Sequence, residues 1–380
     1  MNDRLKTPSL GAIGLAWLCL QTIVFAQSTN PPVPSAPTPA PARLHTWWRD
    51  RNPGERPYTT DNRKMPLISV RGNKFVDPQG NTVLFRGLAI SDPDKLEMQG
   101  HWNKEHFIKV KEMGARLVRI PVHPVAWRER TPVEYLKLLD RAVGWCTELD
   151  LYVMIDWHTI GNLDTEVFQD PMYETTRQET YNFWRTVARH YAGHNTVVFF
   201  ELFNEPTTYR DQLGPIAWTD WKKIVENEIT LIRAYNPQVI PLVAGFDWAY
   251  DLTPLRLNPI AAEGIAYTVH PYANKRSQPW EPRWEEDFGF AADKYPVIAT
   301  EFGGFVRPPA PDSPPAATAE KAERDAAYGP AIIKYLEGKG ISWTVWCFDP
   351  EWGPTLIRNW NYELNPSGEF AKAAMHGEIK

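Results

Sequence analysis

The sequence contains little cysteine. Three cysteines occur in 380 residues, and one of them, Cys19, lies in an apolar segment near the N-terminus. Cys146 falls in a helical pattern and Cys347 in a strand pattern, so we interpret them as two buried free thiols rather than a disulfide. No cysteine pair has the spacing of metal ligands, and neither a His-Glu-x-x-His pattern nor an acidic calcium loop occurs. The sequence therefore predicts no metal site and no cofactor.

An excess of positive charge is also absent. The formal net charge is −5 and the chain has no basic tract, which argues against a nucleic-acid partner. No glycine-rich phosphate loop follows an early strand, although a doubly wound nucleotide-binding sheet usually carries one. The Gly-x-Ser-x-Gly turn of many serine hydrolases is missing as well. These absences disfavour a nucleic-acid-binding protein, a nucleotide-binding fold and a serine hydrolase.

Long apolar runs are confined to the N-terminus. Residues 11–26 are apolar apart from two positions, two basic residues precede them, and Val24 and Ala26 supply the small residues of a cleavage site. We therefore expect residues 1–26 to be a signal peptide and the protein to be secreted or periplasmic. An uncleaved membrane anchor is the alternative, although the run is short for a membrane span. After processing, we expect no stable insertion into a membrane.

Proline is abundant, and a proline-rich tract follows the apolar segment. Residues 27–43 consist mostly of proline, alanine, serine and threonine, a composition that predicts an extended spacer. We expect residues 27–65 to be an irregular linker and residues 66–380 to form one folded domain. A short hairpin, with strands over residues 67–70 and 74–77, is expected to open that domain.

Strand-like and helix-like segments alternate through the domain. The expected strands cover residues 82–88, 117–121, 151–157, 197–203, 239–244, 265–269, 296–300 and 341–348. The expected helices cover residues 105–114, 133–149, 173–191, 218–235 and 319–338, and helical patterns between the fifth and seventh strands are weak. Eight strands with intervening helices predict an α/β fold, a single (β/α)8 TIM barrel.

Two glutamates follow apolar strands of this predicted barrel. Glu205 follows the fourth strand in an Asn-Glu-Pro sequence, and Glu301 follows the seventh strand in a Thr-Glu-Phe-Gly-Gly sequence. A carboxylate beside a buried strand is costly to desolvate, which argues for a function. The C-terminal ends of barrel strands meet at one mouth. Two carboxylates that face each other in one cleft can cleave a glycosidic bond.

Other polar and aromatic residues recur at the same ends of the strands. They are Arg119, His123, Asp156, His158, Asn204, His270, Tyr272 and Trp346. The chain also has 17 tryptophans, more than a core needs, and sugar rings stack on such surfaces. Trp102, Trp157, Trp248, Trp280 and Trp352 are candidates for a sugar-binding groove, with packing in the core as the alternative for each.

Over residues 66–370 the chain resembles glycoside hydrolase family 5, the cellulase-type retaining β-glycanases. The residues that carry the resemblance are Arg119, His158, Asn204, Glu205, His270, Tyr272, Glu301 and Trp346. They match all eight positions that this family uses in its active site. The resemblance adds to the barrel prediction, because the same residues end the expected strands.

The resemblance and the chemistry imply the same roles for these residues. Glu205 is expected to be the general acid/base, with a raised pKa, and Glu301 the nucleophile. Arg119 and Tyr272 are expected to hydrogen-bond to Glu301, and Asn204 to the sugar 2-hydroxyl. His158 and His270 are expected to bind substrate or tune Glu205, His123 to contact sugar hydroxyls, and Trp346 to lie under the sugar. For Arg119, His158, His270 and Trp346 a structural role in the core is the alternative, and Glu201 is interpreted as a structural acceptor.

The resulting expectation is a monomeric retaining endo-β-1,4-glucanase. It would hydrolyse internal bonds of cellulose-type or mixed-linkage β-glucans by double displacement, with carboxyl groups about 5–5.5 Å apart. A β-mannanase or xyloglucanase of the same family is the alternative, because these enzymes share the residues at the cleavage point. A non-catalytic carbohydrate-binding barrel is the alternative of another class, and it would require the loss of a catalytic carboxylate.

Overall fold

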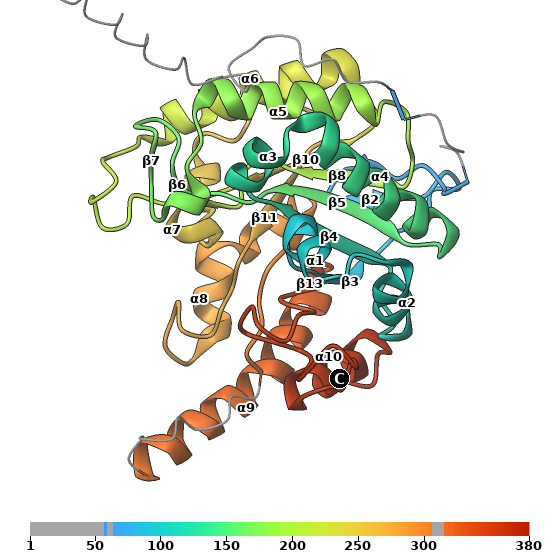
Figure 1. Cartoon of the computed structure of the whole chain (residues 1–380). Helices are drawn as coiled ribbons and strands as arrows, with labels where there is room; N and C mark the ends of the chain where they lie inside the picture. The colour runs from blue at the N-terminus through green and yellow to red at the C-terminus, as the bar shows by residue number, and fades with distance from the viewer. Residues whose placement is uncertain (1–56, 59–63, 306–314, 380) are drawn as a thin grey trace, which may run out of the picture. The chain divides into compact units, whose positions relative to one another are not determined.

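The structure, a computed structural model, describes residues 57–58, 64–305 and 315–379, and for residues 315–325 only the backbone. The expected signal peptide and nearly all of the expected linker lie outside these ranges, so both remain predictions. Figure 1 shows the described elements in chain order. In the part of the chain that the structure describes, no helix has the length and apolar character needed to cross a membrane.

Eight parallel strands close into a barrel. In chain order they are β3 (Arg86–Ala89), β4 (Leu117–Val122), β5 (Tyr152–Trp157), β8 (Val197–Glu201), β10 (Ile240–Ala244), β11 (Ala266–Val269), β12 (Val297–Ala299) and β13 (Ser342–Val345). Each strand pairs with the next, and β13 pairs with β3 to complete the ring. The (β/α)8 barrel expected from the sequence is therefore confirmed.

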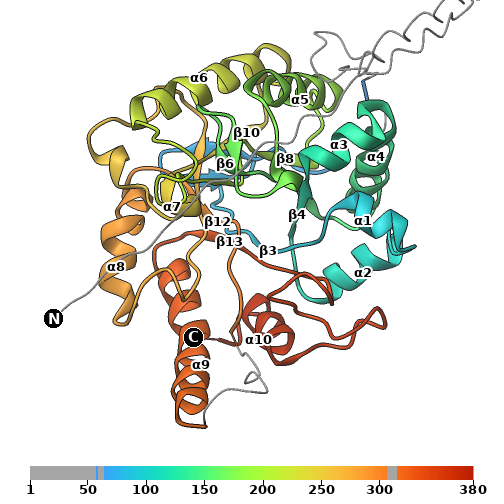
Figure 2. The same ribbon diagram turned by 60° about the vertical axis from the view of Figure 1, so that its left-hand side comes forward.

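Helices surround the barrel, as Figure 2 shows for α4, α5, α6, α8 and α9. The helices are α1 (Pro93–Met98), α2 (Lys104–Glu112), α3 (Pro124–Arg130), α4 (Pro132–Glu148), α5 (Arg177–His190), α6 (Trp218–Tyr235), α7 (Phe246–Ala249), α8 (Trp280–Asp287), α9 (Pro315–Gly338) and α10 (Pro366–Met375). Short 3-10 helices cover η2 (Pro171–Tyr173), η3 (Thr253–Arg256) and η4 (Gly289–Asp293).

The expected elements differ from the observed ones mainly at their ends. The helix expected from residue 173 begins at Arg177, because residues 171–173 form a 3-10 turn and the Thr176 hydroxyl caps α5 by accepting from the Glu179 amide. The first expected strand loses its first half, because the Val83 amide bonds to the Phe75 carbonyl in the hairpin instead of to the barrel.

The N-terminal end of the barrel is closed by an apolar plug. The hairpin of β1 (Ser69–Arg71) and β2 (Lys74–Val76) brings Phe75 onto side chains from the strand starts. The Phe75 and Phe199 rings lie 5.1 Å apart, and Phe85 packs edge-on against Phe199 at 5.3 Å and Tyr152 at 5.4 Å. Aromatic pairs of this kind stabilise a core beyond their buried area. This end of the barrel is therefore built for stability.

Three short strands form a second sheet beside the opposite end of the barrel. They are β6 (Ile160–Asn162), β7 (Val167–Phe168) and β9 (Glu205–Pro206), in the order β7-β6-β9. This sheet fixes the backbone of the segment that leaves β8. The two cysteines of the described part, Cys146 and Cys347, are buried and free, as the sequence predicted.

Candidate active site

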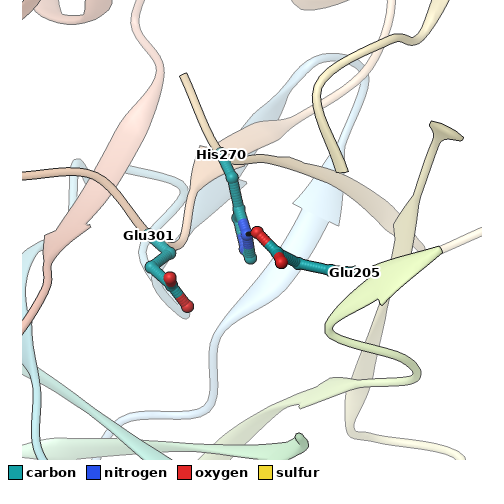
Figure 3. A group of neighbouring side chains, drawn as sticks. All are labelled: Glu205, His270 and Glu301. Atoms are coloured by element: carbon teal, nitrogen blue, oxygen red, sulfur yellow. Dashed lines mark hydrogen bonds and ion pairs between the residues drawn. The ribbon is translucent and has the colours of Figure 1, made fainter. Parts of the chain in front are cut away.

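Glu205 and Glu301 lie together at the C-terminal end of the barrel. Glu205 is the first residue of β9, and Glu301 lies two residues beyond β12. Figure 3 shows the two carboxyl groups with the His270 ring between them. Carboxylate oxygens of both glutamates and a ring nitrogen of His270 lie within 4.8 Å of one another, and each glutamate is 8% exposed. The two glutamates singled out in the sequence therefore face each other in a nearly buried site.

Glu301 is held by two hydrogen bonds. The Arg119 Nη1 donates to Oε2 at 3.2 Å, and the Tyr272 hydroxyl donates to Oε1 at 2.7 Å. Burial raises the pKa of Glu301 and so does the nearby Glu205, whereas the charges on His270 and Arg119 oppose that rise. Both oxygens of this carboxylate are fixed in direction before a substrate arrives.

Arg119 links the carboxylates beneath the site. It is fully buried on β4, and its Nε donates to Glu201 at 2.6 Å while its Nη2 donates to the Asn204 Oδ1 at 2.6 Å and lies 3.0 Å from Asp156. Burial opposes the charge of the guanidinium, but the carboxylates of Asp156, Glu201 and Glu301 raise the pKa of Arg119. Arg119 is therefore a permanent cation that positions Glu301 and Asn204 together.

His270 holds Glu205. Its Nδ1 lies 2.9 Å from the Glu205 Oε1, and its Nε2 lies 3.1 Å from the Thr300 hydroxyl and 3.5 Å from Glu201. Burial lowers the pKa of His270, but Glu301 and the hydrogen bonds to Glu201 and Glu205 outweigh burial and raise it to about 9. Below that pH the imidazolium donates from both ring nitrogens, and Glu205 receives one of the two hydrogen bonds.

Two further carboxylates lie below the facing pair. Glu201 is fully buried and accepts from Arg119 and from the Thr268 and Thr300 hydroxyls. Burial raises the pKa of Glu201, but the charge of Arg119 and the hydrogen bonds from His270 and Arg119 lower it to about 2. The interpretation of Glu201 as a hydrogen-bond acceptor is therefore confirmed. Burial also raises the pKa of Asp156.

The remaining expected residues, His123, His158 and Trp346, form a cluster that His158 joins together. His158 stacks on Trp346, with ring centroids 5.3 Å apart and an interplanar angle of 3°. The His158 Nδ1 lies 2.6 Å from Asp156, and burial lowers the pKa of His158 so that the ring stays neutral. His123 lies 4.6 Å from His158, and its Nδ1 contacts Asp92 at 2.9 Å. Through these contacts the structure brings all nine expected site residues into one network.

Several tryptophans suggested for the groove are not in it. Trp102, Trp157 and Trp280 are buried in the hydrophobic core, and Trp157 stacks on Phe183 with ring centroids 4.1 Å apart. Trp352 lies beside the site, 5.2 Å from His123 and 6.1 Å from Trp346. The position of a tryptophan after a strand does not show whether it lies in the groove or in the core, because a large apolar ring can pack in either place.

A hollow of about 540 Å³ opens from the two glutamates. It is lined by Glu205, Arg210, Asp247, Trp248, Tyr272, Asn274, Lys275, Arg276, Glu301, Gly353 and Pro354. Its size suits a sugar ring or two. Sequence reasoning found Trp248 here but missed Lys275, which follows Tyr272 by three residues in the loop after β11 and has no pattern that marks it.

Glu205, His270 and Glu301 are also close enough to ligate a metal ion. The hydrogen-bond donors around these residues suit a pair of carboxyl groups better than they suit a metal site. Both Glu301 oxygens already accept hydrogen bonds, from Tyr272 and Arg119, and the guanidinium repels a second cation beside it. The arrangement provides one carboxyl group held by a guanidinium and a phenol, and a second held by an imidazole.

Known proteins similar to this chain share its barrel. The family model for cellulase, glycosyl hydrolase family 5, matches residues 76–351. A β-glucanase from Saccharophagus degradans is 43% identical, with a TM-score of 0.80 over 88% of this chain and 99% of that chain. A second crystal structure of that β-glucanase is a complex with cellotetraose.

Curated relatives of known name are more distant in sequence. An endoglucanase from Paenibacillus polymyxa is 22% identical over 369 residues, which cover 83% of this chain and 89% of that protein. Endoglucanase A from Butyrivibrio fibrisolvens is 28% identical over 216 residues, which cover 54% of this chain and 45% of that protein. The match therefore spans less than half of the second relative's length.

Proposed function

The chain belongs to the cellulase family, glycosyl hydrolase family 5, and we propose that it is a retaining endo-β-1,4-glucanase in which Glu301 is the nucleophile and Glu205 the general acid/base. Membership of the family makes the chain a glycoside hydrolase of the cellulase type. The finer assignment rests on one observation: the two facing carboxyl groups have different hydrogen-bond partners.

The hydrogen bonds favour Glu301 as the nucleophile. A permanently charged guanidinium and a phenol direct their protons at its two oxygens, and both contacts stabilise the ionised form. Glu205 accepts instead a single hydrogen bond, from the His270 imidazolium to one oxygen, which leaves its second oxygen to hold a proton and meet the substrate. A carboxyl group with one free oxygen can carry a proton to and from the scissile bond.

In the first step the Glu301 carboxylate attacks the anomeric carbon. Glu205 gives its proton to the glycosidic oxygen, so the leaving sugar departs as an alcohol and a glycosyl ester of Glu301 remains. In the second step Glu205 accepts a proton from water, and the hydroxide attacks the same carbon and releases Glu301. Two inversions give net retention at the anomeric centre. Arg119 and Tyr272 then restrain the released carboxylate for the next cycle.

The substrate proposed is an internal bond of a cellulose-type or mixed-linkage β-glucan. Cellotetraose, bound by the 43% identical β-glucanase, is a β-1,4-linked glucose tetramer. In this chain Trp346 is partly stacked under His158 and has 6% of its surface exposed, which places an apolar ring at the floor of the site. Asn204, oriented by Arg119, would bind the 2-hydroxyl of the sugar.

Hydrolysis of a polysaccharide panel tests this function. The panel is carboxymethylcellulose, barley mixed-linkage glucan, xyloglucan and glucomannan, each with wild type, Glu205→Gln and Glu301→Gln. Cleavage of the first two glucans is expected, with a loss of about 10²–10⁴-fold in either variant. Glu263→Gln, on an exposed loop before β11, is the matched control and should keep wild-type activity. Cleavage of xyloglucan or glucomannan alone would contradict the substrate, and activity in both variants would contradict the mechanism.

The two roles can be separated with an activated substrate. The dinitrophenolate group of 2,4-dinitrophenyl β-cellobioside departs without needing a proton. With this substrate, Glu205→Ala should form the glycosyl ester at Glu301 but hydrolyse the ester slowly. Azide should then rescue turnover and give a β-glycosyl azide, because the ester is attacked from the free face. Glu301→Ala lacks the nucleophile and should give no β-azide. The opposite pattern would exchange the two assignments.

We also propose that the protein is exported and acts outside the cytoplasm. The support is the composition of residues 1–26, with basic residues before an apolar segment and small residues at its end. N-terminal sequencing of the protein from culture medium or periplasm should give a start at or near Gln27. An intact Met1 in the membrane fraction would contradict cleavage.

A further inference from the structure

The hollow beside the two glutamates is lined mainly by loops that follow neighbouring strands of the barrel. Its lining comes from the loops after β8, β10 and β11, together with Gly353 and Pro354. Both glutamates line it too, and the Trp346 ring nitrogen donates at 3.2 Å to the backbone carbonyl of Gly353, one of the lining residues. Glu205 follows β8, and Arg210 from the same loop also lines the hollow, so the hollow extends from the proposed acid toward the loops after β10 and β11. A general acid protonates the oxygen between two sugars, so the departing sugar lies on its side of the cleavage point.

Lys275 is a cation of this hollow that the proposed reaction does not use. Its ammonium donates to the backbone carbonyl of Asp247 at 2.8 Å and lies 4.6 Å from the centroid of the Trp248 ring. Among the described residues it forms no ion pair. An ammonium has three protons to donate, and the carbonyl accepts one of them. A partly buried ammonium with unused donors is suited to the hydroxyl groups of a ligand.

Trp248 lies beneath this ammonium, on a backbone segment with an uncommon conformation. Asp247, Trp248 and Ala249 have φ values of 57°, 56° and 56°, the left-handed region that side chains other than glycine avoid. Such conformations persist where surrounding contacts impose them, and they cluster at functional sites. The ring nitrogen donates to the Gln169 Oε1 at 2.8 Å, and Tyr209 packs edge-on at 5.8 Å.

We propose that Lys275 is a specificity residue of the first leaving-group subsite, where its ammonium, held over Trp248, donates hydrogen bonds to hydroxyls of the neutral sugar that departs in the first step. The same sugar position would receive an acceptor alcohol when a sugar rather than water attacks the glycosyl ester. This inference rests on the proposed function, because it takes Glu205 as the acid that marks the leaving side.

The test compares a substrate that fills the subsite with one that does not. Cellotetraose places a sugar on the leaving side, whereas 2,4-dinitrophenyl β-cellobioside places an aryl group there and needs no acid. Lys275→Met removes the charge and the donors but keeps the chain length. We expect it to lower kcat/KM for cellotetraose about tenfold, the effect of one charged hydrogen bond, and to leave the aryl substrate within about twofold of wild type. Lys294→Met, at an exposed position before β12, is the matched control.

A ratio measured within one reaction removes any dependence on the amount of folded enzyme. With the aryl cellobioside as donor and cellobiose as acceptor, the ratio of transfer to hydrolysis should fall about tenfold in Lys275→Met, because water does not need the subsite. Lys275→Arg keeps a cationic donor and should recover most of the ratio. An unchanged ratio in Lys275→Met, or equal losses on both substrates, would overturn the inference.

The control that separates this inference from the proposed function is Glu301→Gln. If wild type hydrolyses the aryl substrate and this variant does not, the assigned chemistry stands and the ratio alone decides the role of Lys275. If the variant retains aryl hydrolysis, the assigned nucleophile is wrong and the subsite inference, which rests on it, fails with it.

Discussion

The two ends of the barrel interior are built from the same strands and have opposite chemistry. At the N-terminal end, Phe85, Tyr152 and Phe199 pack as rings without a charge among them. At the C-terminal end, Arg119, Asp156 and Glu201 bring a guanidinium and two carboxylates into full burial. Stability and chemistry are therefore placed at opposite ends, and a change at one end should leave the other largely intact.

Strand parity explains how one strand serves both ends. Residues two apart on a strand point to the same face, so Phe199 and Glu201 of β8 both point into the barrel, one step apart along its axis. On β5 the same step leads from Met154 in the apolar plug to Asp156 in the polar network. Along each of these strands, the surroundings change from apolar to charged within two residues. Burial is complete in both layers, so only the partners of each side chain distinguish them.

The apolar end should respond to truncation in stability alone. Phe85→Ala removes a ring that is 0% exposed and contacts three others, so we expect it to lower the free energy of unfolding by about 3–5 kcal/mol. The kcat/KM of the folded fraction should stay within about twofold of wild type. Urea unfolding and glucan hydrolysis of the same preparation measure both. A fall in kcat/KM comparable to that of a site variant would break the separation between the two ends.

A milder truncation calibrates this measurement. Val70, which packs partly buried against the same cluster, loses less surface when replaced by alanine, so Val70→Ala should cost about 1 kcal/mol or less. A loss as large as that of Phe85→Ala would indicate that the hairpin, rather than the rings, determines the stability of this end.

Much of this organisation could be predicted from the sequence. Apolar segments of five to eight residues alternate with amphipathic helices, and this periodicity predicts the barrel and the approximate end of each strand. The catalytic candidates followed because polar residues are unusual directly after buried strands. Chain proximity also helped, since Asn204 and Glu205 share one turn and His270 and Tyr272 share another. The resemblance to the family supplied the individual roles.

The sequence could not predict features that depend on contacts between distant segments. Lys275 is one lysine among many until the loop after β10 places Trp248 beneath its ammonium. Trp157 follows the rule for a strand end but turns outward onto Phe183. Only the second part of the strand expected at residues 82–88 joins the barrel, because the Val83 amide donates to the Phe75 carbonyl in the hairpin. In each case the deciding interaction lies between parts of the chain whose distance in space no local pattern encodes.

The charged end of the barrel should make the free energy of unfolding depend on pH. The folded-state pKa of His270 is about 9, above the usual 6.5, so its stabilising effect is fully present below pH 6.5 and is lost as pH rises through 9. The loss should approach about 3 kcal/mol, since each pKa unit corresponds to about 1.4 kcal/mol. Unfolding free energies of wild type and His270→Gln should therefore converge between pH 6.5 and pH 10. A constant difference across that range would show that His270 is not an imidazolium in the folded protein.

At the charged end, a smaller effect is expected where the two layers of the site meet, at Glu201. This carboxylate accepts from Arg119, which holds Glu301, and lies 3.5 Å from the His270 ring that holds Glu205, so it anchors the supports of both catalytic candidates. Glu201→Gln keeps the shape but removes the charge, and we expect a loss in kcat of about tenfold, or about 1.4 kcal/mol.

The pH profile distinguishes this anchoring role from packing. Glu201 is one of the groups that raise the pKa of His270. Without its charge the imidazolium should lose its proton at lower pH, and the alkaline limb of kcat/KM in Glu201→Gln should move toward neutral pH. Glu263→Gln, far from the network, should leave the profile in place. A uniform loss at every pH with an unmoved alkaline limb would mean that Glu201 only fills space, and the charged layer would then act on the two glutamates through Arg119 alone.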